Sequence, residues 1–382
     1  MATIERVELK MVSLAPKVLR EDAIQTFERQ ETPMVTITDS DGATGTGYSY
    51  TIGTGGPSVT ALLEHTLAPR LLGRDAERIG GIWTDLLRST HATAVGAITS
   101  LALAAVDTAL WDLRCRRAKL PLWRMAGGAR ERVPVYSTEG GWLNLSREEL
   151  AEQATAAKEE GFLGTKMKVG KPTAGEDAAR VAAVRDAVGD DFEVMVDANQ
   201  GFALAEAMRR ARALEELRVG WLEEPMPADN VLAHKRLSEA TSVPIAVGES
   251  MYSLGQFNEY LTIGATTMVQ VDVARIGGIT PWLKVAALAE AHNVAVSPHF
   301  LMELHLALVC AVPNAAWLEY IPQLDPITAS PIAMENGYAL PSDEPGLGIE
   351  WDWDAINARA EHVVSINGGG TAQGSELREA AE

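Results

Sequence analysis

The feature that most constrains the fold is a regular alternation of short apolar runs with amphipathic segments, which begins near Arg132. Each run is rich in β-branched or small apolar residues and precedes a helical pattern of roughly ten to fifteen residues. Parallel strands need crossover connections of about this length, so the pattern predicts a parallel α/β fold. The predicted strands are Val133–Tyr136, Gly164–Val169, Phe192–Asp197, Gly220–Glu223, Ile245–Gly248, Met268–Asp272, Ala295–Ser297 and Trp317–Glu319. The helices predicted between them include Arg147–Gly161, Gly175–Val188, Ala203–Leu217 and Ile279–Asn293.

Two arrangements fit this pattern. Eight strands spread over ~190 residues favour a closed barrel, which is the most economical way to arrange strand–helix units. A doubly wound open sheet is the alternative. No GxGxxG follows the first predicted strand, which makes that alternative less favoured.

The segments on either side of this region follow different patterns. Residues 1 to about 50 alternate in strand fashion, and residues 58–120 carry apolar residues at helical spacing. Residues 326–364 return to turns and short strands, and a Gly-rich polar stretch follows. We therefore divide the chain into an α+β module (1–130), a barrel (131–320), a segment that returns to the first module (321–365) and a flexible tail (366–382).

Composition limits the classes of partner. The 33 basic and 52 acidic residues give a formal net charge of 33 − 52 = −19, which disfavours binding to nucleic acid or to an anionic membrane. Residues 1–10 lack a signal-peptide pattern, and the apolar stretch 95–110 is too short and too polar to span a membrane. The two cysteines, Cys115 and Cys310, have no metal-ligand spacing and are interpreted as small buried hydrophobes. A reducing, cytoplasmic location is therefore expected.

Ionisable residues stand at or just after the carboxyl ends of seven successive predicted strands. In a parallel barrel these ends meet at one face, where catalytic groups are held. The residues are Lys166 and Lys168, then Asp197, Glu223, Glu249, Asp272, His299 and Glu319. The spacings from Asp197 onward, 26, 26, 23, 27 and 20 residues, are close to one strand–helix unit each. The sequence thus predicts one site into which all of these side chains project.

Three of these residues, Asp197, Glu223 and Glu249, are acids on neighbouring predicted strands. Three converging carboxylates without a partner would repel one another and raise at least one pKa. A hard divalent cation with oxygen ligands resolves that conflict, so we predict a Mg²⁺ site. Any one of these acids alone could instead cap a helix or pair with an arginine. Glu224 is left out of the ligand set because strand alternation directs it away from Glu223.

Lys166 and Lys168 lie two residues apart on a predicted strand, so both should face the barrel interior. Burying an ammonium group is costly unless an anion compensates it. Two ammonium groups held together near a metal lower each other's pKa, which would make one of them a base near neutral pH. The alternative is a solvated pair at a ragged strand end.

His299 gains its significance from Asp272 on the preceding predicted strand. A carboxylate next to one imidazole nitrogen fixes the tautomer and makes the other nitrogen a better base. This dyad and Lys168 would place a base on each face of a substrate carbon. His305, on the following helix, is predicted to have a packing role.

These residues, in this order and spacing, resemble the enolase superfamily, and within it the mandelate racemase subgroup. The resemblance covers essentially the whole chain. It implies a (β/α)₇β-type modified TIM barrel with an α+β capping domain, formed by the N-terminal region and the returning C-terminal segment. It also implies a homo-oligomer, with an octamer as a candidate state.

The resemblance assigns a role to each residue of the predicted site. Superfamily sites use a Lys or His base with Mg²⁺ stabilising an enediolate, which implies abstraction of the α-proton of a carboxylate. Lys168 and the His299–Asp272 dyad would be the opposing acid/base groups. Lys166 would contact the substrate carboxylate, and Glu319 would hydrogen-bond the enediolate. The implied Mg²⁺ ligands are Asp197, Glu223 and Glu249.

The fate of the enediolate separates the reactions of this subgroup. Loss of a β-hydroxyl gives a 2-keto-3-deoxy acid, return of the proton to the other face gives a racemase or epimerase, and internal attack gives a cycloisomerase. Residues 168–172 and 298–303 resemble talarate/galactarate dehydratases. Residues 45–50 and 122–128 also resemble anhydrogalactonate cycloisomerases, which differ around the seventh strand. We expect an acid-sugar dehydratase, with a racemase, a cycloisomerase or a non-catalytic sugar-acid binding protein as alternatives.

Substrate choice in this family depends on the loop near residues 15–30. Lys17 and Arg20 in this loop suit a polyhydroxylated, dianionic acid, whereas an outward-facing solvated loop is the alternative. Trp142, after the first barrel strand, is a candidate wall of the pocket. Asn199, two residues after Asp197, is a candidate substrate contact.

Overall fold

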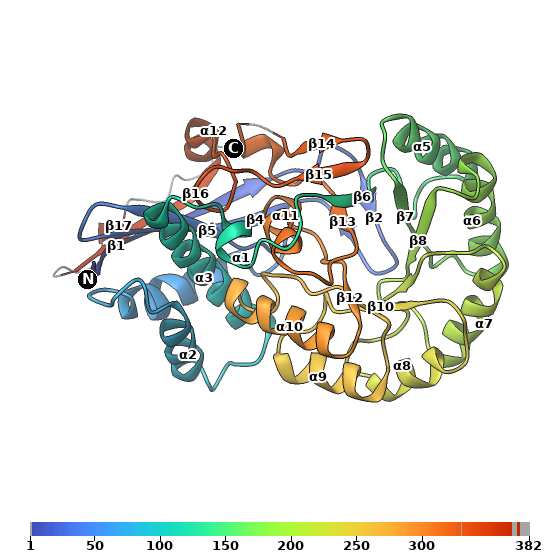
Figure 1. Cartoon of the computed structure of the whole chain (residues 1–382), viewed down its shortest axis with the longest axis horizontal. Helices are drawn as coiled ribbons and strands as arrows, with labels where there is room; N and C mark the ends of the chain where they lie inside the picture. Colours follow the sequence, from blue (N-terminus) through green and yellow to red (C-terminus); the bar gives the residue numbers. More distant parts are fainter. Residues whose placement is uncertain (1, 330, 369–372, 375–382) are drawn as a thin grey trace, which may run out of the picture.

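The computed structural model of the chain describes residues 2–329, 331–368 and 373–374 (Figure 1). A ring of strands surrounded by helices forms one end of the molecule, and an antiparallel sheet with helices forms the other. The N-terminus lies at the sheet end, far from the outer helices of the ring.

The ring is a closed parallel barrel. Successive strands from β6 to β12 are hydrogen-bonded to one another, and β13 pairs with β6. Val296 joins the two ends, since its N–H donates to Asn314 O (2.9 Å) and its carbonyl accepts from Ala316 N (2.8 Å). This closure confirms the predicted (β/α)₇β barrel, and the open-sheet alternative is wrong.

The barrel strands lie close to the predicted ranges. They are β6 (Val133–Ser137), β7 (Gly164–Lys168), β8 (Glu193–Asp197), β9 (Leu222–Glu223), β10 (Ile245–Val247), β11 (Met268–Val269), β12 (Ala295–Val296) and β13 (Leu318–Tyr320). The helices between them are α5 (Arg147–Glu159), α6 (Ala174–Val188), α7 (Leu204–Glu215), α8 (Val231–Ser238), α9 (Leu254–Ile263), α10 (Ile279–Ala291) and α11 (Met302–Ala311). Strand β11 ends before Asp272 because a turn begins there, in which Asp272 Oδ1 accepts the N–H groups of Ala274 and Arg275.

The floor of the barrel is apolar. Tyr136, Met195, Trp221 and Ala246 form a small cluster of buried residues separate from the main core. The rings of Tyr136 and Trp221 pack edge to face, with 5.4 Å between their centroids. Side chains two residues apart on a strand share a face. The residue two positions after each of these therefore also faces inward, as Glu223 does after Trp221. The floor therefore closes the barrel beneath a layer of polar side chains.

The capping domain is built on a sheet with strand order β17–β16–β1–β4–β5. Its strands are β1 (Ile4–Leu14), β4 (Gln30–Asp39), β5 (Thr44–Tyr48), β16 (Ala360–Asn367) and β17 (Gln373–Gly374). Its helices are α1 (Gly56–Leu62), η1 (Leu63–Leu67), η2 (Ala68–Arg70), α2 (Ile79–Ser89), α3 (Ala97–Ala118) and α4 (Leu122–Met125). Strand β16 pairs antiparallel with β1, so the C-terminal segment completes a sheet begun by the N-terminus.

Helix α3 lies unusually close to β5. A Cβ atom on Gly47 would lie 2.2 Å from the backbone N of Ala109, and one on Gly45 would lie 2.3 Å from that of Leu113. Only glycine fits such an approach, which explains the Gly-x-Gly of this strand. The Thr108 hydroxyl accepts the N–H of Tyr48 at 3.2 Å across the same contact.

A hairpin of the capping domain covers the barrel mouth. It consists of β2 (Arg20–Glu21) and β3 (Thr26–Phe27). The N–H of Leu143, in the loop after β6, donates to Glu21 O at 2.8 Å. Ala23 Cβ lies 3.0 Å from the position that a Cβ on Gly170 would take, just after β7. The loop expected to select substrate is therefore packed on the carboxyl ends of the barrel strands.

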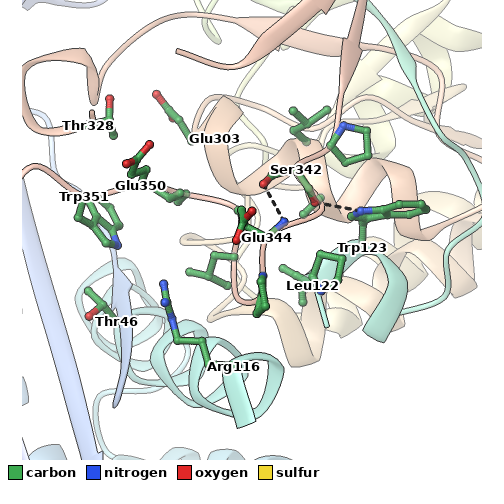
Figure 2. Close-up of a pocket in the computed structure, with 18 of the residues that line it drawn as sticks. Thr46, Arg116, Leu122, Trp123, Glu303, Thr328, Ser342, Glu344, Glu350 and Trp351 are labelled. Atoms are coloured by element: carbon green, nitrogen blue, oxygen red, sulfur yellow. Dashed lines mark hydrogen bonds between the residues drawn. The ribbon is translucent and has the colours of Figure 1, made fainter. Parts of the chain in front are cut away.

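The remaining C-terminal elements are η3 (Asp325–Ile327), β14 (Ala333–Glu335), β15 (Tyr338–Leu340) and α12 (Trp353–Arg359). A cavity of about 1150 Å³ lies between this segment, the capping domain and the barrel helix α11, and its lining includes Thr46, Arg116, Trp123, Glu303 and Trp351 (Figure 2). Of the described residues that line it, none belongs to the predicted site.

Other sequence predictions concern single features. Cys115 and Cys310 are free and buried, as predicted. Among the helices of the described residues, none is both long and apolar enough to cross a membrane. Residues 369–372 and 375–382 of the predicted flexible tail lie outside the described residues.

Candidate active site

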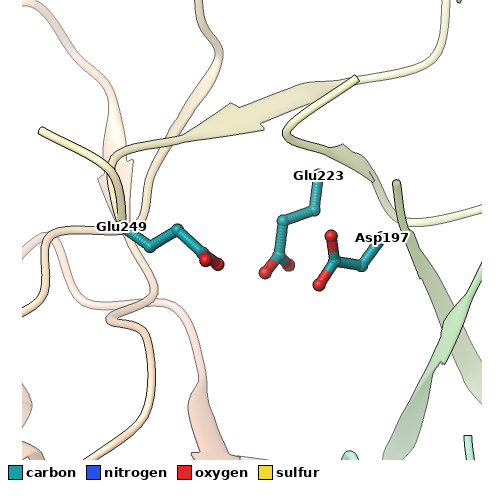
Figure 3. A group of neighbouring side chains, drawn as sticks. All are labelled: Asp197, Glu223 and Glu249. Atoms are coloured by element: carbon teal, nitrogen blue, oxygen red, sulfur yellow. The ribbon is translucent and has the colours of Figure 1, made fainter. Parts of the chain in front are cut away.

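Three carboxylates meet at the carboxyl ends of β8, β9 and β10 (Figure 3). One oxygen each of Asp197, Glu223 and Glu249 lies within 4.8 Å of the others. The three residues are 0%, 0% and 5% exposed. Gly248 precedes the last of them with φ 147, and a Cβ there would lie 2.8 Å from the backbone of Gln270. A glycine is thus needed where β10 ends and Glu249 turns toward the other two acids.

The pKa values of two of these acids, Glu223 and Asp197, are shifted in opposite directions. Burial, and then the charge of Asp197, raise the pKa of Glu223 well above its usual value. Burial would also raise the pKa of Asp197, but the ammonium groups of Lys168 and Lys166 overcome it and lower that pKa. Glu223 Oε2 is oriented by Gln270 Nε2 at 2.6 Å and by Trp221 Nε1 at 2.9 Å. Buried oxygen ligands with excess negative charge suit a hard divalent cation.

Lys166 and Lys168 project from β7 into the barrel and are buried. Lys166 Nζ lies 2.7 Å from Glu223 Oε1 and 2.8 Å from Glu319 Oε1, and Lys168 Nζ donates to Asp197 Oδ2. Burial lowers the pKa of both lysines, but the facing carboxylates outweigh it and raise both pKa values. Lys166 lowers the pKa of Lys168, as predicted, but the carboxylates, chiefly Asp197, raise it by more and set the net direction. A lowered net pKa beside a metal stays a prediction.

The histidine and its carboxylate lie on the other side of the site. Asp272 and His299 each stand three residues beyond the end of a strand, β11 and β12. His299 Nδ1 lies 2.9 Å from Asp272 Oδ2. Burial raises the pKa of Asp272, but the hydrogen bond and charge of His299 outweigh it, and the pKa falls to about 2. An ionised carboxylate only accepts, so Nδ1 carries the proton that it donates to Asp272. The other ring nitrogen, Nε2, lies 3.4 Å from Glu249 Oε2 and so faces the carboxylate triad.

Glu319, on β13, joins the two sides. Its Oε1 accepts from Thr138 Oγ1 (2.6 Å) and lies 2.8 Å from Lys166 Nζ, while its Oε2 accepts from Phe300 N (2.7 Å). Burial raises the pKa of Glu319, but Lys166 and then His299 lower it to a net value well below the usual range. Glu319 is therefore an ionised group among these partners.

His305 makes two hydrogen bonds with the backbone beside the dyad. Its Nδ1 donates to Phe300 O at 2.8 Å, and its Nε2 accepts from Val273 N at 3.1 Å. It therefore links the turn after His299 with the turn after Asp272.

Two residues beside the triad differ in their contacts. Asn199 is buried, its N–H donates to Asp197 Oδ1 at 2.9 Å, and its Oδ1 has no hydrogen-bond partner among the described residues. Glu224 Oε2 accepts from Gln200 Nε2 at 3.1 Å and from Ser250 Oγ at 3.2 Å. The group of acids close enough to share an ion contains Asp197, Glu223 and Glu249 but not Glu224.

The loop residues predicted to contact substrate are placed differently from one another. Arg20 is 3% exposed, donates to Gln323 Oε1 at 2.7 Å and to Glu139, and lies over the ring of Trp142 at 5.8 Å. Lys168 Nζ lies 5.6 Å from the same ring, so Trp142 connects Arg20 with the lysine side. The Lys17 side chain is 66% exposed and pairs with Asp325.

Several residues of the site were missed from the sequence. Trp221 and Gln270 could have been found, because each stands two residues before a predicted site residue and shares its face of the strand. Arg275 follows Asp272 by three residues, and Tyr50 comes from the capping domain. The Tyr50 hydroxyl donates to Asp272 Oδ2 at 2.6 Å, a contact that no pattern in the sequence predicts.

Comparisons with known proteins agree with this geometry. Residues 6–127 match the family profile of the mandelate racemase/muconate lactonizing enzyme N-terminal domain, and residues 149–355 match the enolase C-terminal domain-like family. The chain is 37% identical to the L-talarate/galactarate dehydratase of Salmonella typhimurium over 313 residues, which span 82% of this chain and 78% of that protein. It is 39% identical to the 3,6-anhydro-alpha-L-galactonate cycloisomerase of Streptomyces coelicolor over 328 residues, which span 85% of this chain and 90% of that protein.

The fold of the chain also closely matches that of a solved structure. The crystal structure of the Salmonella typhimurium L-talarate/galactarate dehydratase, liganded with Mg and L-lyxarohydroxamate, superposes with a TM-score of 0.92. The superposition covers 96% of this chain and 95% of that one at 33% identity. The chain therefore belongs to the mandelate racemase/muconate lactonizing enzyme group of the enolase superfamily.

Proposed function

We propose that this protein is a Mg²⁺-dependent acid-sugar dehydratase. The α-proton of a carboxylate substrate is removed, the β-hydroxyl leaves as water, and the product is a 2-keto-3-deoxy acid. The observation that carries this proposal is a buried triad of carboxylates with a lysine pair on one side and a histidine–carboxylate dyad on the other. The similarity to a named talarate/galactarate dehydratase supports it.

The carboxylate triad fits Mg²⁺. Asp197, Glu223 and Glu249 offer hard oxygen ligands within 4.8 Å of one another, and we assign them as the metal ligands. A Mg²⁺ held by these residues would supply a positive charge that polarises the substrate carboxylate and would favour loss of the α-proton. Gln270 and Trp221 donate hydrogen bonds to Glu223 Oε2, which orients the carboxylate and keeps its other oxygen, Oε1, directed at the site.

The lysine side supplies one base and one fixed positive charge. Lys168 must be neutral to accept a proton, and Asp197, followed by Glu223 and Glu249, raises its pKa and keeps it charged. Asp197 attracts Lys168 less strongly once its own charge is shared with a cation, which brings the pKa of Lys168 down toward the working range. Lys166, held between Glu223 and Glu319, keeps its charge and faces the developing oxyanion.

The histidine side supplies the second acid/base group. Asp272 fixes the proton on His299 Nδ1, so Nε2 accepts a proton from substrate or, once protonated, returns one. In the elimination, one of Lys168 and His299 takes the α-proton. The other gives a proton to the β-hydroxyl as the C–O bond breaks, and the resulting enol becomes the ketone. Negative charge on the enediolate raises the pKa of Glu319, which is ionised in the resting site. Glu319 donates a hydrogen bond to the enediolate only after it has taken up a proton from solvent or substrate.

Substrate contacts are assigned to the residues that border this site. Asn199 offers a buried amide oxygen without a partner among residues 2–329, 331–368 and 373–374. Trp142 and Arg20 form a wall beside Lys168. Lys17 is exposed and paired, so we rank it below Arg20 as a substrate contact. We also propose that the protein is cytoplasmic and that it forms a homo-oligomer. Light scattering after gel filtration would test the oligomeric state.

The proposal is tested by incubating the protein and Mg²⁺ with a panel of aldarates and aldonates and assaying for α-keto acid. We expect one or a few acids to be converted, with no activity after treatment with EDTA and recovery on adding Mg²⁺. A panel without any α-keto acid product, at full metal loading, would contradict the dehydratase proposal.

A cycloisomerase is the second candidate, because the chain is 39% identical to a named 3,6-anhydro-alpha-L-galactonate cycloisomerase. That reaction gives a product with the mass of the substrate, whereas dehydration loses one water. A racemase would exchange the α-proton in D₂O without net change of mass apart from deuterium. A non-catalytic binding protein would bind an acid sugar without any deuterium incorporation.

A further inference from the structure

The structure assigns to Tyr50 of the capping domain the positioning of the His299–Asp272 dyad. This inference rests on the acid/base role proposed above for that dyad. Tyr50 stands two residues beyond β5, on the surface of the capping domain that meets the barrel, and it is 2% exposed. Its hydroxyl lies 2.6 Å from Asp272 Oδ2, the same oxygen that accepts from His299 Nδ1 at 2.9 Å.

The direction of the hydrogen bonds around Tyr50 is fixed by their partners. Asp272 is ionised, so it accepts from both Tyr50 and His299. Burial raises the pKa of Tyr50 well above its usual value, so the phenol keeps the proton that it donates. Arg275 Nε donates to Tyr50 Oη at 3.0 Å. The sequence of donors therefore runs from Arg275 through Tyr50 to Asp272.

The second oxygen of Asp272 is held by the backbone. Asp272 Oδ1 accepts from Ala274 N at 2.7 Å and from Arg275 N at 3.1 Å. These two bonds fix one end of the carboxylate, and Tyr50 fixes the rotation of the other end, to which His299 binds. Without the Tyr50 hydroxyl, His299 would be the remaining described side-chain donor at hydrogen-bond distance from Oδ2. The plane of the carboxylate would then be less well determined.

Tyr50 also reaches His299 by a second route, through an aromatic stack. Its ring lies 4.6 Å from that of Phe300, and the Phe300 ring stacks on the His299 imidazole at 5.3 Å with 15° between the planes. Phe300 and Leu301 have φ values of 60° and 34°, which are unfavourable for residues with a Cβ. A turn of this kind needs surrounding contacts to hold it, and Tyr50 supplies one of them.

The capping domain thus does more than cover the substrate. The barrel carries both members of the dyad, but one of the donors that orients their carboxylate comes from the other domain. Arg275 extends this link, because its Nη1 donates to Glu249 O at 3.1 Å, on the metal side. If Tyr50 only filled the interface between the domains, its ring would matter and its hydroxyl would not.

Tyr50→Phe separates these two roles, because it keeps the ring and removes the hydroxyl. Tyr48→Phe is a matched control: Tyr48 is also buried, packs its ring on Trp351, and its hydroxyl has no hydrogen-bond partner in the described part of the chain. Both variants are made in the full chain with Mg²⁺. The readouts are kcat and KM for the acid sugar that the wild type converts, and the downfield proton resonance of His299 Nδ1–H. That resonance is assigned by its loss in His299→Asn.

We expect Tyr50→Phe to lower kcat on the order of 10-fold while KM changes less than about 2-fold, because one hydrogen bond to a charged group is lost. The Nδ1–H resonance should move downfield, since Asp272 then receives one competing donor fewer. A fluorinated tyrosine at position 50 is a stronger donor and should move it upfield. Tyr48→Phe should leave the resonance and both constants unchanged. Equal behaviour of Tyr50→Phe and Tyr48→Phe in both readouts would overturn the inference.

The resonance keeps this test separate from the proposed function. If the wild type converts no acid sugar, the dehydratase proposal fails, while the NMR comparison on the resting protein still decides the role of Tyr50. If Tyr50→Phe does not fold, the fluorinated tyrosine provides the decision, because it preserves the shape and hydrogen bonds of the residue. An unshifted resonance with the fluorinated residue would then contradict the inference.

Discussion

The lysine side and the histidine side of this site are built in different ways. The lysine side lies within the barrel, since Lys166, Lys168, Asp197 and Glu223 stand on the three adjacent strands β7, β8 and β9. Parallel register places Lys168 opposite Asp197, and Asp197 opposite Glu223. Strand pairing alone therefore brings these charges together.

The histidine side depends on parts of the chain that are far apart in sequence. Asp272 and His299 lie beyond the ends of β11 and β12, so no strand pairing fixes them. They are held by Tyr50 from the capping domain, by the backbone of the turn after Asp272, and by His305. A charged cluster inside a barrel can thus be specified by register, whereas groups on loops need a second domain to orient them.

The largest effect is expected from two separate variants, each of which removes the base of one side. Lys168→Ala and His299→Asn should each lower kcat/KM by roughly 10²- to 10⁴-fold, because each removes a group that transfers a proton. The variant that lacks the abstracting base should also lose exchange of the α-proton in D₂O, while the other variant keeps it. Lys171→Ala, in the loop after β7, serves as the control and should retain activity. Full activity in either variant would contradict the assignment of that base.

A smaller effect is expected from the support of the metal ligands on the lysine side. Gln270→Leu removes the donor to Glu223 Oε2 and should weaken Mg²⁺ binding by about 10- to 100-fold. Isothermal titration calorimetry of the protein with Mg²⁺ measures this directly. Gln323→Leu is the matched control, since Gln323 bonds to Arg20 and should leave the affinity unchanged. Equal affinities in the two variants would mean that Gln270 does not orient the ligand.

The difference between the two sides also explains what could be predicted from the sequence. The barrel, the carboxylate triad, the lysine pair and the His299–Asp272 pair follow from residues at strand ends, because parallel strands bring those ends to one face. The contact between Tyr50 and Asp272 depends on how two domains dock, and neither residue type nor spacing reveals it. The burial of Arg20 and the exposure of Lys17 depend on the same docking.

The direction of the lysine pKa shifts could not be predicted from the sequence, for a different reason. The ammonium group of Lys166 and the facing carboxylate of Asp197 shift the pKa of Lys168 in opposite directions, and their distances decide the net shift. The alternation of strand residues identifies which groups face one another but does not give those distances. The position of each charge had to be known before the sign could be stated.

The smallest expected effect is the contribution of one residue on the histidine side, His305, to the pH dependence of stability. Burial lowers the pKa of His305 from 6.5 to about 4, so between these values the unfolded chain binds a proton that the folded chain does not. His305 therefore destabilises the fold as pH falls through this range, by about 1.4 kcal/mol at pH 5.5 relative to pH 8. The lowered pKa values of Asp197 and Glu319 act only below about pH 4.5, where their unfolded forms begin to bind protons. Burial raises the pKa values of Asp107 and Glu303 to about 7, so these acids stabilise the fold over the same pH range and the test must compare two proteins. In urea unfolding at pH 8 and 5.5, the free energy of unfolding of His305→Gln should change more favourably toward pH 5.5 than that of the wild type, by about 1.4 kcal/mol. An equal change in both proteins would contradict the role of His305.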